Sequence, residues 1–558
     1  MRLIVLLFLS LVFCPILNAQ ISISASEINF PITIVGNSSF RSISITNDSP
    51  YLKEFRLVLN SNLRFNTEDS LISLPSGTPV NINFSFTPNH NIIEEGLIAY
   101  QNEDSSEAIV VKLKGSGNYG DMYDAITFNL FDTQLKQALS SYVSNHTSLG
   151  YNTARDKMFM EFDNKRVNSG GATQNTLECV YTGRLAVGYT SRTDAQNNYN
   201  FNTEHTWPQG QFGSADPMVS DLFHLFPTDN TANSIRGNYP FGVAASNITW
   251  SVGDSKRGNS WNGNIVFEPR DVHKGNVARG MLYFQLRYPQ NYGSFLDTAQ
   301  ENIFRVWNLL DTVDLAERNR NNAITLLQGK RNPLIDHPEF VSRIYSFRSN
   351  TIRPKYAQFS AFPQLAILDT TFIGDTTYFN LNLLNTGNAT LIVNSVTSSD
   401  SRFLLDSTID SISSSSAKAL RVIFIPDSSI NYSTQLNFQT SIGNFAYQVI
   451  GFGIEKPNSI NEGNLFIPDF YLAQNYPNPF NPLTQISYSI PIGNYVNLKV
   501  FDILGNEIVT LVNKYQEAGS YKVTFDTMNN KINVPSGFYI YSLNSNGITI
   551  SKKMLLVK

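Results

Sequence analysis

The stretch Asn202–Gln209 places a carboxylate beside an imidazole, in Glu204 and His205. A second polar cluster, Gly275–Arg279, contains Asn276. Hydrolysis of a phosphodiester requires an activated water, a cation on the phosphate oxygens and neutralisation of the charge that develops. An imidazole that titrates near neutral pH suits the base. Carboxylate and amide oxygens suit Mg²⁺, which keeps several waters. The two clusters therefore predict one metal-assisted site that cuts phosphodiesters.

This site makes one geometric demand on the backbone. Neighbouring residues of a regular strand point to opposite faces, so Glu204 and His205 cannot both face one phosphate from a flat strand. We expect a bend or loop at this position, with Pro208 helping to end the strand.

Asn276 is expected on a helix from about Val272 to Tyr288, capped by Asp271. On such a helix Asn276 and Arg279 would face the cleft. The opposite face would pack into the core through Val277, Met281 and Phe284.

A zinc site is an alternative, because His224 and His273 can join His205. The chain contains no His-x-x-x-His or Cys pair that would support zinc, and His224 is predicted to be a structural hydrogen-bonding residue. Glu268 is equally consistent with support of the metal and with a structural ion pair.

Three further groups are expected to be structural. Trp207 is predicted to pack in the core and Cys179 to be a buried apolar filler. Asp336 and His337 are predicted to anchor the end of the domain.

Composition describes a multidomain, β-rich chain. At 558 residues it is too long for one core, and length suggests three or four domains. Only 15% of residues are charged and the net charge is −4, so any attraction for nucleic acid must be local. The segment from Arg236 to Arg287 contains seven basic residues and three acidic ones. This excess predicts a basic stripe that binds phosphates without reading bases.

Residues 1–19 are predicted to be a signal peptide: Arg2, the apolar run Leu3–Phe13 and a cleavage site at Ala19. No later stretch is apolar and long enough to span a membrane. Cleavage would leave Cys179 as the one cysteine, so internal disulfides are excluded.

Period-two alternation predicts a β-sandwich at 20–117 and a second at 357–455. Strands and turns of the first recur in the second, which indicates an internal repeat. Gly115–Asn118 is expected to be a flexible joint. Residues 470–558 open on a Pro-rich segment and predict one more small sandwich.

The region 119–350 has helical periodicity instead. Asp132 is expected to cap a helix that buries Leu135 and Leu139. Two further helices are predicted around Ile303–Leu310 and Ala316–Gln328, and the loop-rich stretch before them is where we expect chemistry.

This central region resembles the endonuclease I family, whose nucleases have an α+β fold with a ββα-metal site. The resemblance rests on several ordered blocks: Cys179-Val-Tyr-Thr-Gly, Asn202-Thr-Glu-His-Thr-Trp-Pro, Ser220-Asp-Leu-Phe-His-Leu-Phe-Pro-Thr-Asp, Asn233-Ser-Ile-Arg-Gly-Asn, Phe267-Glu-Pro, Gly275-Asn-Val-Ala-Arg and Arg331-Asn-Pro-Leu-Ile-Asp-His-Pro. It implies that His205 is the general base, that Glu204 and Asn276 bind the metal, and that Arg236 lies beside the phosphate. Many relatives have Asp where this chain has Asn276, which implies a weaker hold on the metal.

The flanking sandwiches resemble immunoglobulin-like modules of exported bacterial proteins. Residues 470–558 resemble a type IX secretion sorting domain, on the Pro-rich opening, the Phe501-Asp-Ile-Leu-Gly-Asn-Glu turn, the Ala518-Gly-Ser-Tyr segment and the Lys-Lys-Met tail. This implies recognition by that secretion machinery and release outside the cell or at its surface.

Together these features predict a secreted, monomeric, sequence-nonspecific endonuclease that acts on DNA, with RNA as a second substrate. The family resemblance implies that it leaves 5′-phosphate ends. The expected cofactor is Mg²⁺, with Mn²⁺ and Ca²⁺ as alternatives. The competing hypothesis is a surface adhesin with an inactive nuclease-like domain.

Overall fold

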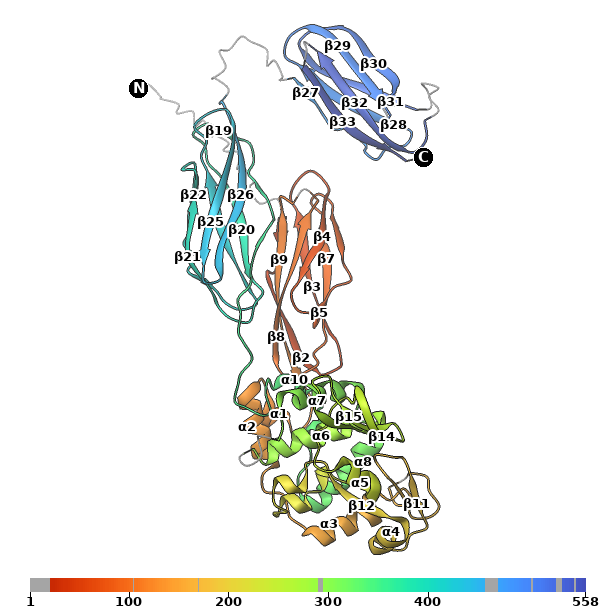
Figure 1. Cartoon of the computed structure of the whole chain (residues 1–558). Helices are drawn as coiled ribbons and strands as arrows, with labels where there is room; N and C mark the ends of the chain where they lie inside the picture. Colours follow the sequence, from red (N-terminus) through yellow and green to blue (C-terminus); the bar gives the residue numbers. More distant parts are fainter. Residues whose placement is uncertain are drawn as a thin grey trace, which may run out of the picture. The chain divides into compact units, whose positions relative to one another are not determined.

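The computed structural model describes residues 21–103, 105–168, 170–289, 295–456, 470–502, 505–527, 534–545 and 548–557 (Figure 1). The signal peptide predicted at 1–19 lies outside these residues. The chain divides into two compact units, Met1–Glu455 and Lys456–Lys558.

The first unit begins with two facing β-sheets. One has the order β1 (Ile21–Ile23), β3 (Ser39–Asn47), β7 (Val80–Phe86), β5 (Phe65–Asn66). The other has the order β2 (Glu27–Ile34), β9 (Ala108–Asn118), β8 (Ile93–Asn102), β4 (Lys53–Asn60), β6 (Leu71–Leu74). Alternate residues of both sheets, among them Ile45 and Val111, are buried in one shared core, because successive strand side chains point to opposite faces.

The flexible joint expected at Gly115–Asn118 is wrong, because these residues complete strand β9. A Cβ on Gly115 would lie 2.5 Å from the ring of Phe86, and one on Gly117 would lie 1.9 Å from the carbonyl oxygen of His90. The glycines are therefore needed for close packing.

The same arrangement returns after the central region. One sheet has the order β17 (Phe359–Phe362), β20 (Thr377–Asn385), β24 (Ser416–Phe424), β22 (Phe403–Leu405). The other has the order β18 (Ala366–Ile367), β26 (Gly443–Ile454), β25 (Asn431–Thr440), β21 (Leu391–Ser398), β23 (Ser411–Ile412), and β19 (Thr371–Phe372) also pairs with β26. Buried Asn47 and Asn385 occupy equivalent strand ends and donate to backbone carbonyls. The internal repeat is confirmed.

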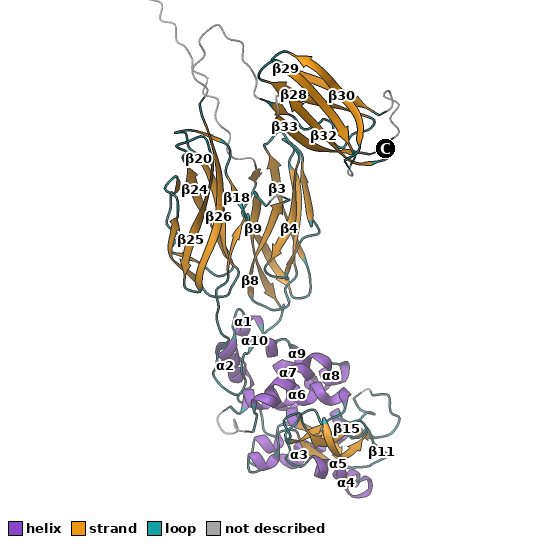
Figure 2. Cartoon of the chain, turned by 45° about the horizontal axis from the view of Figure 1, so that its top comes forward, coloured by secondary structure: helices purple, strands orange, loops and turns teal. Residues whose placement is uncertain are grey.

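The central region is mixed helix and strand, with short strands and helices shown in orange and purple in Figure 2. Its helices are α1 (Asp124–Thr127), α2 (Asp132–Val143), α3 (Tyr151–Lys157), α4 (Arg192–Tyr199), α5 (Asn230–Arg236), α6 (Asp271–Arg287), α7 (Thr298–Leu310), α8 (Leu315–Gln328), α9 (Pro333–Asp336) and α10 (Phe340–Arg343). Its strands form three small sheets: β10 (Thr176–Glu178) with β11 (Leu185–Val187), β12 (Phe201–His205) with β13 (Leu225–Asp229), and β14 (Ser246–Val252), β15 (Ser255–Asn259), β16 (Ile265–Glu268).

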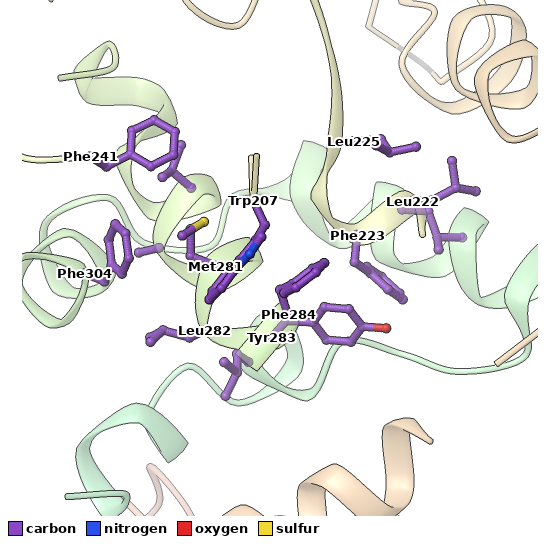
Figure 3. Close-up of a cluster of buried hydrophobic side chains, with 14 of the residues drawn as sticks. Trp207, Leu222, Phe223, Leu225, Phe241, Met281, Leu282, Tyr283, Phe284 and Phe304 are labelled. Atoms are coloured by element: carbon purple, nitrogen blue, oxygen red, sulfur yellow. The ribbon is translucent and has the colours of Figure 1, made fainter. Parts of the chain in front are cut away.

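Helix α6 runs through the core of this region, and the helix predicted from Val272 is thereby confirmed. Val277, Met281 and Phe284 are fully buried, as expected. The ring of Trp207 stacks on Phe284 with centroids 4.6 Å apart, and Figure 3 shows both within one apolar cluster. Trp207, two residues after His205, is thus confirmed as a core residue that ties the site to α6.

Both predicted helix caps are wrong. Asp132 is the first residue of α2, and its carboxylate accepts from the amides of Tyr345 and Arg353 instead of from its own helix. Asp271 is the first residue of α6 and pairs with Lys274. Sequence pattern alone does not separate a capping carboxylate from one that binds a distant segment.

The second unit contains two sheets around its own core. Their orders are β27 (Tyr471–Leu472), β28 (Leu483–Ile490), β31 (Gly519–Asp526), and β30 (Glu507–Gln516), β29 (Asn494–Phe501), β32 (Gly537–Ser545), β33 (Ile548–Leu556). Throughout the described residues, none of the helices is apolar and long enough to cross a bilayer.

We predict that Gly117→Ala destabilises the first unit by about 2–3 kcal/mol, because its new methyl must displace the backbone at His90. Gly519→Ala is the matched control, since its Cβ would meet nothing closer than 3.8 Å. Calorimetric unfolding measures both changes. Equal stability of the two variants would contradict the packing role of Gly117.

Candidate active site

Glu204 and His205 lie at the end of an uninterrupted strand. β12 and β13 pair antiparallel in one register from Phe201 opposite Asp229 to His205 opposite Leu225. The bend that we expected at Glu204 and His205 is therefore absent. Because side chains alternate along a strand, the two face opposite sides of the ladder.

Glu204 is buried on one face of the ladder. Its Oε1 accepts a hydrogen bond from the Tyr181 hydroxyl at 2.8 Å and lies 3.0 Å from Nε of Arg236. Burial raises the pKa of Glu204 to about 7, although the Arg236 guanidinium acts in the opposite direction. Oε2 makes no hydrogen bond with the described residues.

Arg236, on the last turn of α5, is fully buried. Its guanidinium donates to the carbonyl of Thr206 at 2.6 Å and to that of Gly237 at 2.5 Å, and it stacks on Phe241. The residue predicted to lie beside the phosphate is thus directed at Glu204 and at the backbone that follows β12.

His205 faces the other side of the ladder, against Tyr151, Phe212 and His224. Its Nε2 lies 3.2 Å from the carbonyl oxygen of Val219. A carbonyl can only accept, so Nε2 carries the proton and Nδ1 keeps a lone pair. Burial lowers the pKa of His205 to about 3, so the ring is neutral at neutral pH.

Asn276 is half-buried and lines a cavity of about 290 Å³ together with His273 and Phe226. Phe226 is the cross-strand partner of Glu204, and paired residues share a face of the ladder. Pro227, the neighbour of Phe226 on β13, lines the same cavity, whereas neither Glu204 nor His205 is among its lining residues.

Arg279 does not face the cleft, and that expectation is wrong. Its guanidinium is fully buried and binds both carboxylate oxygens of Glu317, at 2.8 and 2.6 Å. A third bond reaches the carbonyl of Asp311.

The predicted basic stripe is largely neutralised in the fold. Arg236 and Arg279 form the ion pairs described above. In addition, Arg270 pairs with Glu178 and Lys274 pairs with Glu268. The pair with Lys274 also assigns Glu268 a structural role. Spacing along the chain could not reveal these partners, which come from other elements.

The described part of the chain contains no cluster of three or more His, Cys, Asp or Glu side chains that could hold a metal. His205 and His224 have ring centroids 5.5 Å apart, but Nε2 of His224 bonds the carbonyl of Met218. His273 instead contacts Phe226. The zinc alternative therefore has no support, and the structural role of His224 is confirmed.

The predicted burial of Cys179 and the anchoring role of Asp336 and His337 are also confirmed, but Cys179 is not a purely apolar filler. Cys179 is fully buried and accepts a hydrogen bond from the amide of Asp229. His337 binds Asp121, and Asp336 forms an ion pair with Arg331.

Two residues that contribute to the site were not identified from the sequence. Tyr181 holds Glu204, and its position within the block Cys179-Val-Tyr-Thr-Gly was the only signal for it. The carbonyl of Val219 fixes the tautomer of His205, and a backbone acceptor leaves no signal in the sequence.

We predict that Arg279→Met destabilises the first unit by about 3–5 kcal/mol, because it leaves Glu317 buried without its partner. The double variant Arg279→Met, Glu317→Leu should recover part of this loss. Arg192→Met, which removes a more exposed pair with Asp156, should cost about 1 kcal/mol or less. Denaturant unfolding measures all three. A mild effect of Arg279→Met would contradict the buried pair.

We also predict a loss of stability in acid. Burial lowers the pKa of His90 to about 4 and of His205 and His273 to about 3, below the value near 6.5 in an unfolded chain. Each therefore binds protons more readily when unfolded. The contribution of each histidine to the free energy of unfolding is complete above pH about 6.5. This contribution is lost as the pH falls towards the pKa of that histidine in the folded protein.

The thermal midpoint measured between pH about 8 and about 5 tests this expectation. His273→Phe, which keeps an aromatic ring beside Phe226, should reduce the slope. An unchanged midpoint over this range would show that these histidines do not control acid stability.

Comparison with known proteins supports a nuclease domain in the central region. Residues 131–339 match the family described as endonuclease I, and residues 474–558 match the secretion system C-terminal sorting domain. The chain is 32% identical over 232 residues to the extracellular ribonuclease of Bacillus amyloliquefaciens, covering 38% of this chain and 74% of that protein. It is 27% identical over 169 residues to an extracellular deoxyribonuclease of Aeromonas hydrophila, covering 27% of this chain and 72% of that protein. The chain therefore belongs to the endonuclease I family and is a secreted or surface-located endonuclease with a secretion sorting domain.

Proposed function

We propose that this endonuclease hydrolyses phosphodiester bonds of DNA and RNA without sequence specificity, with His205 as general base. The observation that carries the proposal is the bond between Nε2 of His205 and the carbonyl of Val219. It leaves Nδ1 as a proton acceptor on a ring that burial keeps neutral.

In this mechanism Nδ1 of His205 takes a proton from the attacking water, whose oxygen forms a bond to phosphorus. The bond from phosphorus to the 3′ oxygen breaks, and the product carries a 5′-phosphate. His205 is the last residue of β12. A phosphate can therefore interact with groups from both faces of the ladder only at this end of the strand.

Nucleases of this family are metal-dependent, and we propose Mg²⁺ held by Glu204 and Asn276. The donor types fit, since Mg²⁺ prefers oxygen and few protein ligands. Their proximity is supported by the cavity that Asn276 lines together with Phe226, the cross-strand partner of Glu204. Oε2 of Glu204 provides the oxygen not engaged by Tyr181 and Arg236. When bound, the metal would stabilise negative charge on the phosphate.

We assign Arg236 to holding Glu204 and the Thr206 carbonyl, since its guanidinium is fully buried and directed at both. Contact of Arg236 with the phosphate, as implied by the family resemblance, stays a prediction. Loss of this side chain would disorder the backbone directly after His205.

Both nucleic acids are proposed as substrates, because the relatives include proteins named ribonuclease and deoxyribonuclease. Nothing in the proposed site depends on base identity. We expect recognition of the phosphate backbone, which is sequence-independent.

For the architecture, we propose a signal peptide at 1–19, immunoglobulin-like modules at 20–117 and 357–455, a nuclease domain at 119–350 and a sorting domain at 470–558. We propose that β12 and β13 form a ββα-metal motif with helix α6, which carries the second metal ligand, Asn276. We further propose a monomer, exported by type IX machinery that recognises the last domain.

We predict that His205→Ala lowers the cleavage rate of plasmid DNA by about 10²–10⁴-fold, because the water loses its general base. His90→Ala removes a histidine of the first sandwich and serves as the control. Gel-based initial rates at saturating Mg²⁺ measure the effect. Plasmid cut by His205→Ala at the wild-type rate would overturn the assignment, provided both variants unfold like the wild type.

EDTA should stop cleavage, and added Mg²⁺ should restore it. Mn²⁺ and Ca²⁺ are to be compared in the same titration. Glu204→Gln should shift the Mg²⁺ dependence to higher concentration, because it removes the one carboxylate among the proposed ligands. An unchanged Mg²⁺ titration would exclude Glu204 as a ligand.

A further inference from the structure

A positive charge on the His205 face of the ladder would stabilise the phosphate in addition to any contact that Arg236 makes. Arg236 is buried with Glu204 on the opposite face. We propose that Arg155 of α3 binds the non-bridging oxygens of the scissile phosphate beside His205. This inference rests on the proposed role of His205 as the base.

Arg155 is placed by a single aromatic side chain. Its Cζ lies 4.0 Å from the ring centroid of Tyr151, and that ring lies 5.5 Å from the ring of His205. Stacking on an aromatic face holds the plane of a guanidinium while leaving its edge free to donate hydrogen bonds. Tyr151 thus holds the cation one ring away from the base.

The donors of Arg155 are not fully used by the fold. Nη2 donates to Oδ1 of Asn152 at 2.7 Å, whereas the buried Nε has no hydrogen-bond partner among the described residues. No carboxylate within that set forms an ion pair with Arg155. Nearby Arg192, in contrast, is paired with Asp156 at 2.6 Å.

A buried donor without a partner is costly, and a bound ligand is one of the groups that can satisfy it. The planar fork of arginine matches two phosphate oxygens. As water attacks phosphorus and His205 takes its proton, negative charge grows on those oxygens. Arg155 would stabilise the transition state through charge-assisted hydrogen bonds, while the leaving 3′ oxygen acquires a proton from solvent.

The test compares Arg155→Met and Arg155→Lys with the control Arg192→Met in the full chain. Single-turnover cleavage of a duplex should slow by about 10²–10³-fold in Arg155→Met, with partial recovery in Arg155→Lys. Arg192→Met should change the rate little, because Asp156 already offsets its charge. Calorimetry must show that all three variants remain folded.

A binding measurement separates contact with phosphate from a structural role. In the His205→Ala background, which binds without cutting, duplex affinity is measured by fluorescence anisotropy at several salt concentrations. Adding Arg155→Met should reduce the slope of log affinity against log salt by about 0.9, the value for one phosphate contact. Adding Arg192→Met should leave the slope unchanged.

These measurements support or contradict the contact between Arg155 and the phosphate. An unchanged rate and salt slope in Arg155→Met, or equal losses in Arg192→Met, would overturn the phosphate contact. Failure of the proposed function would look different: the wild type would not cut, or His205→Ala would cut normally. A normal wild type, an inactive His205→Ala and a fully active Arg155→Met would reject this inference alone.

Discussion

The alternation of side chains along β12 is the constraint on which the site depends. An unbroken ladder with β13 sends Glu204 to one face and His205 to the other. The two faces consequently have different chemistry. One holds a buried carboxylate with Tyr181 and Arg236, and the other holds a neutral imidazole against aromatic rings. Both side chains can therefore reach one substrate group only at the end of the strand.

The surrounding fold keeps this strand end in place with buried charges. Arg236 holds the Thr206 carbonyl directly after His205, and Trp207 stacks on Phe284 of α6. Helix α6 is in turn fixed to α8 through the bidentate pair of Arg279 with Glu317. Breaking one member of such a pair leaves a buried charge, so these arginines act as rigid supports. The charge of Arg279 is offset by Glu317 and does not form part of a basic surface.

Much of the fold was predictable because burial on one face imposes a period on the sequence. The strands of both sandwiches, their repeat and the core face of α6 all followed from that period. The errors concern polar groups. Asp132 and Asp271 resemble helix caps, yet they bind Tyr345, Arg353 and Lys274. A polar side chain can be satisfied by any nearby segment, so local sequence does not determine its partner.

The sequence by itself determined the family, the secretion sorting domain and the residue types of the candidate site. Ordered motifs such as Asn202-Thr-Glu-His can be recognised in the sequence without knowledge of the fold. Only the tertiary structure decided which face each group occupies. It separated His205 from Glu204, gave His205 its tautomer through the Val219 carbonyl, and buried Arg279 away from solvent. The physical reason is that strand register, backbone acceptors and ion-pair partners arise from contacts between distant segments, whereas residue type and spacing are local.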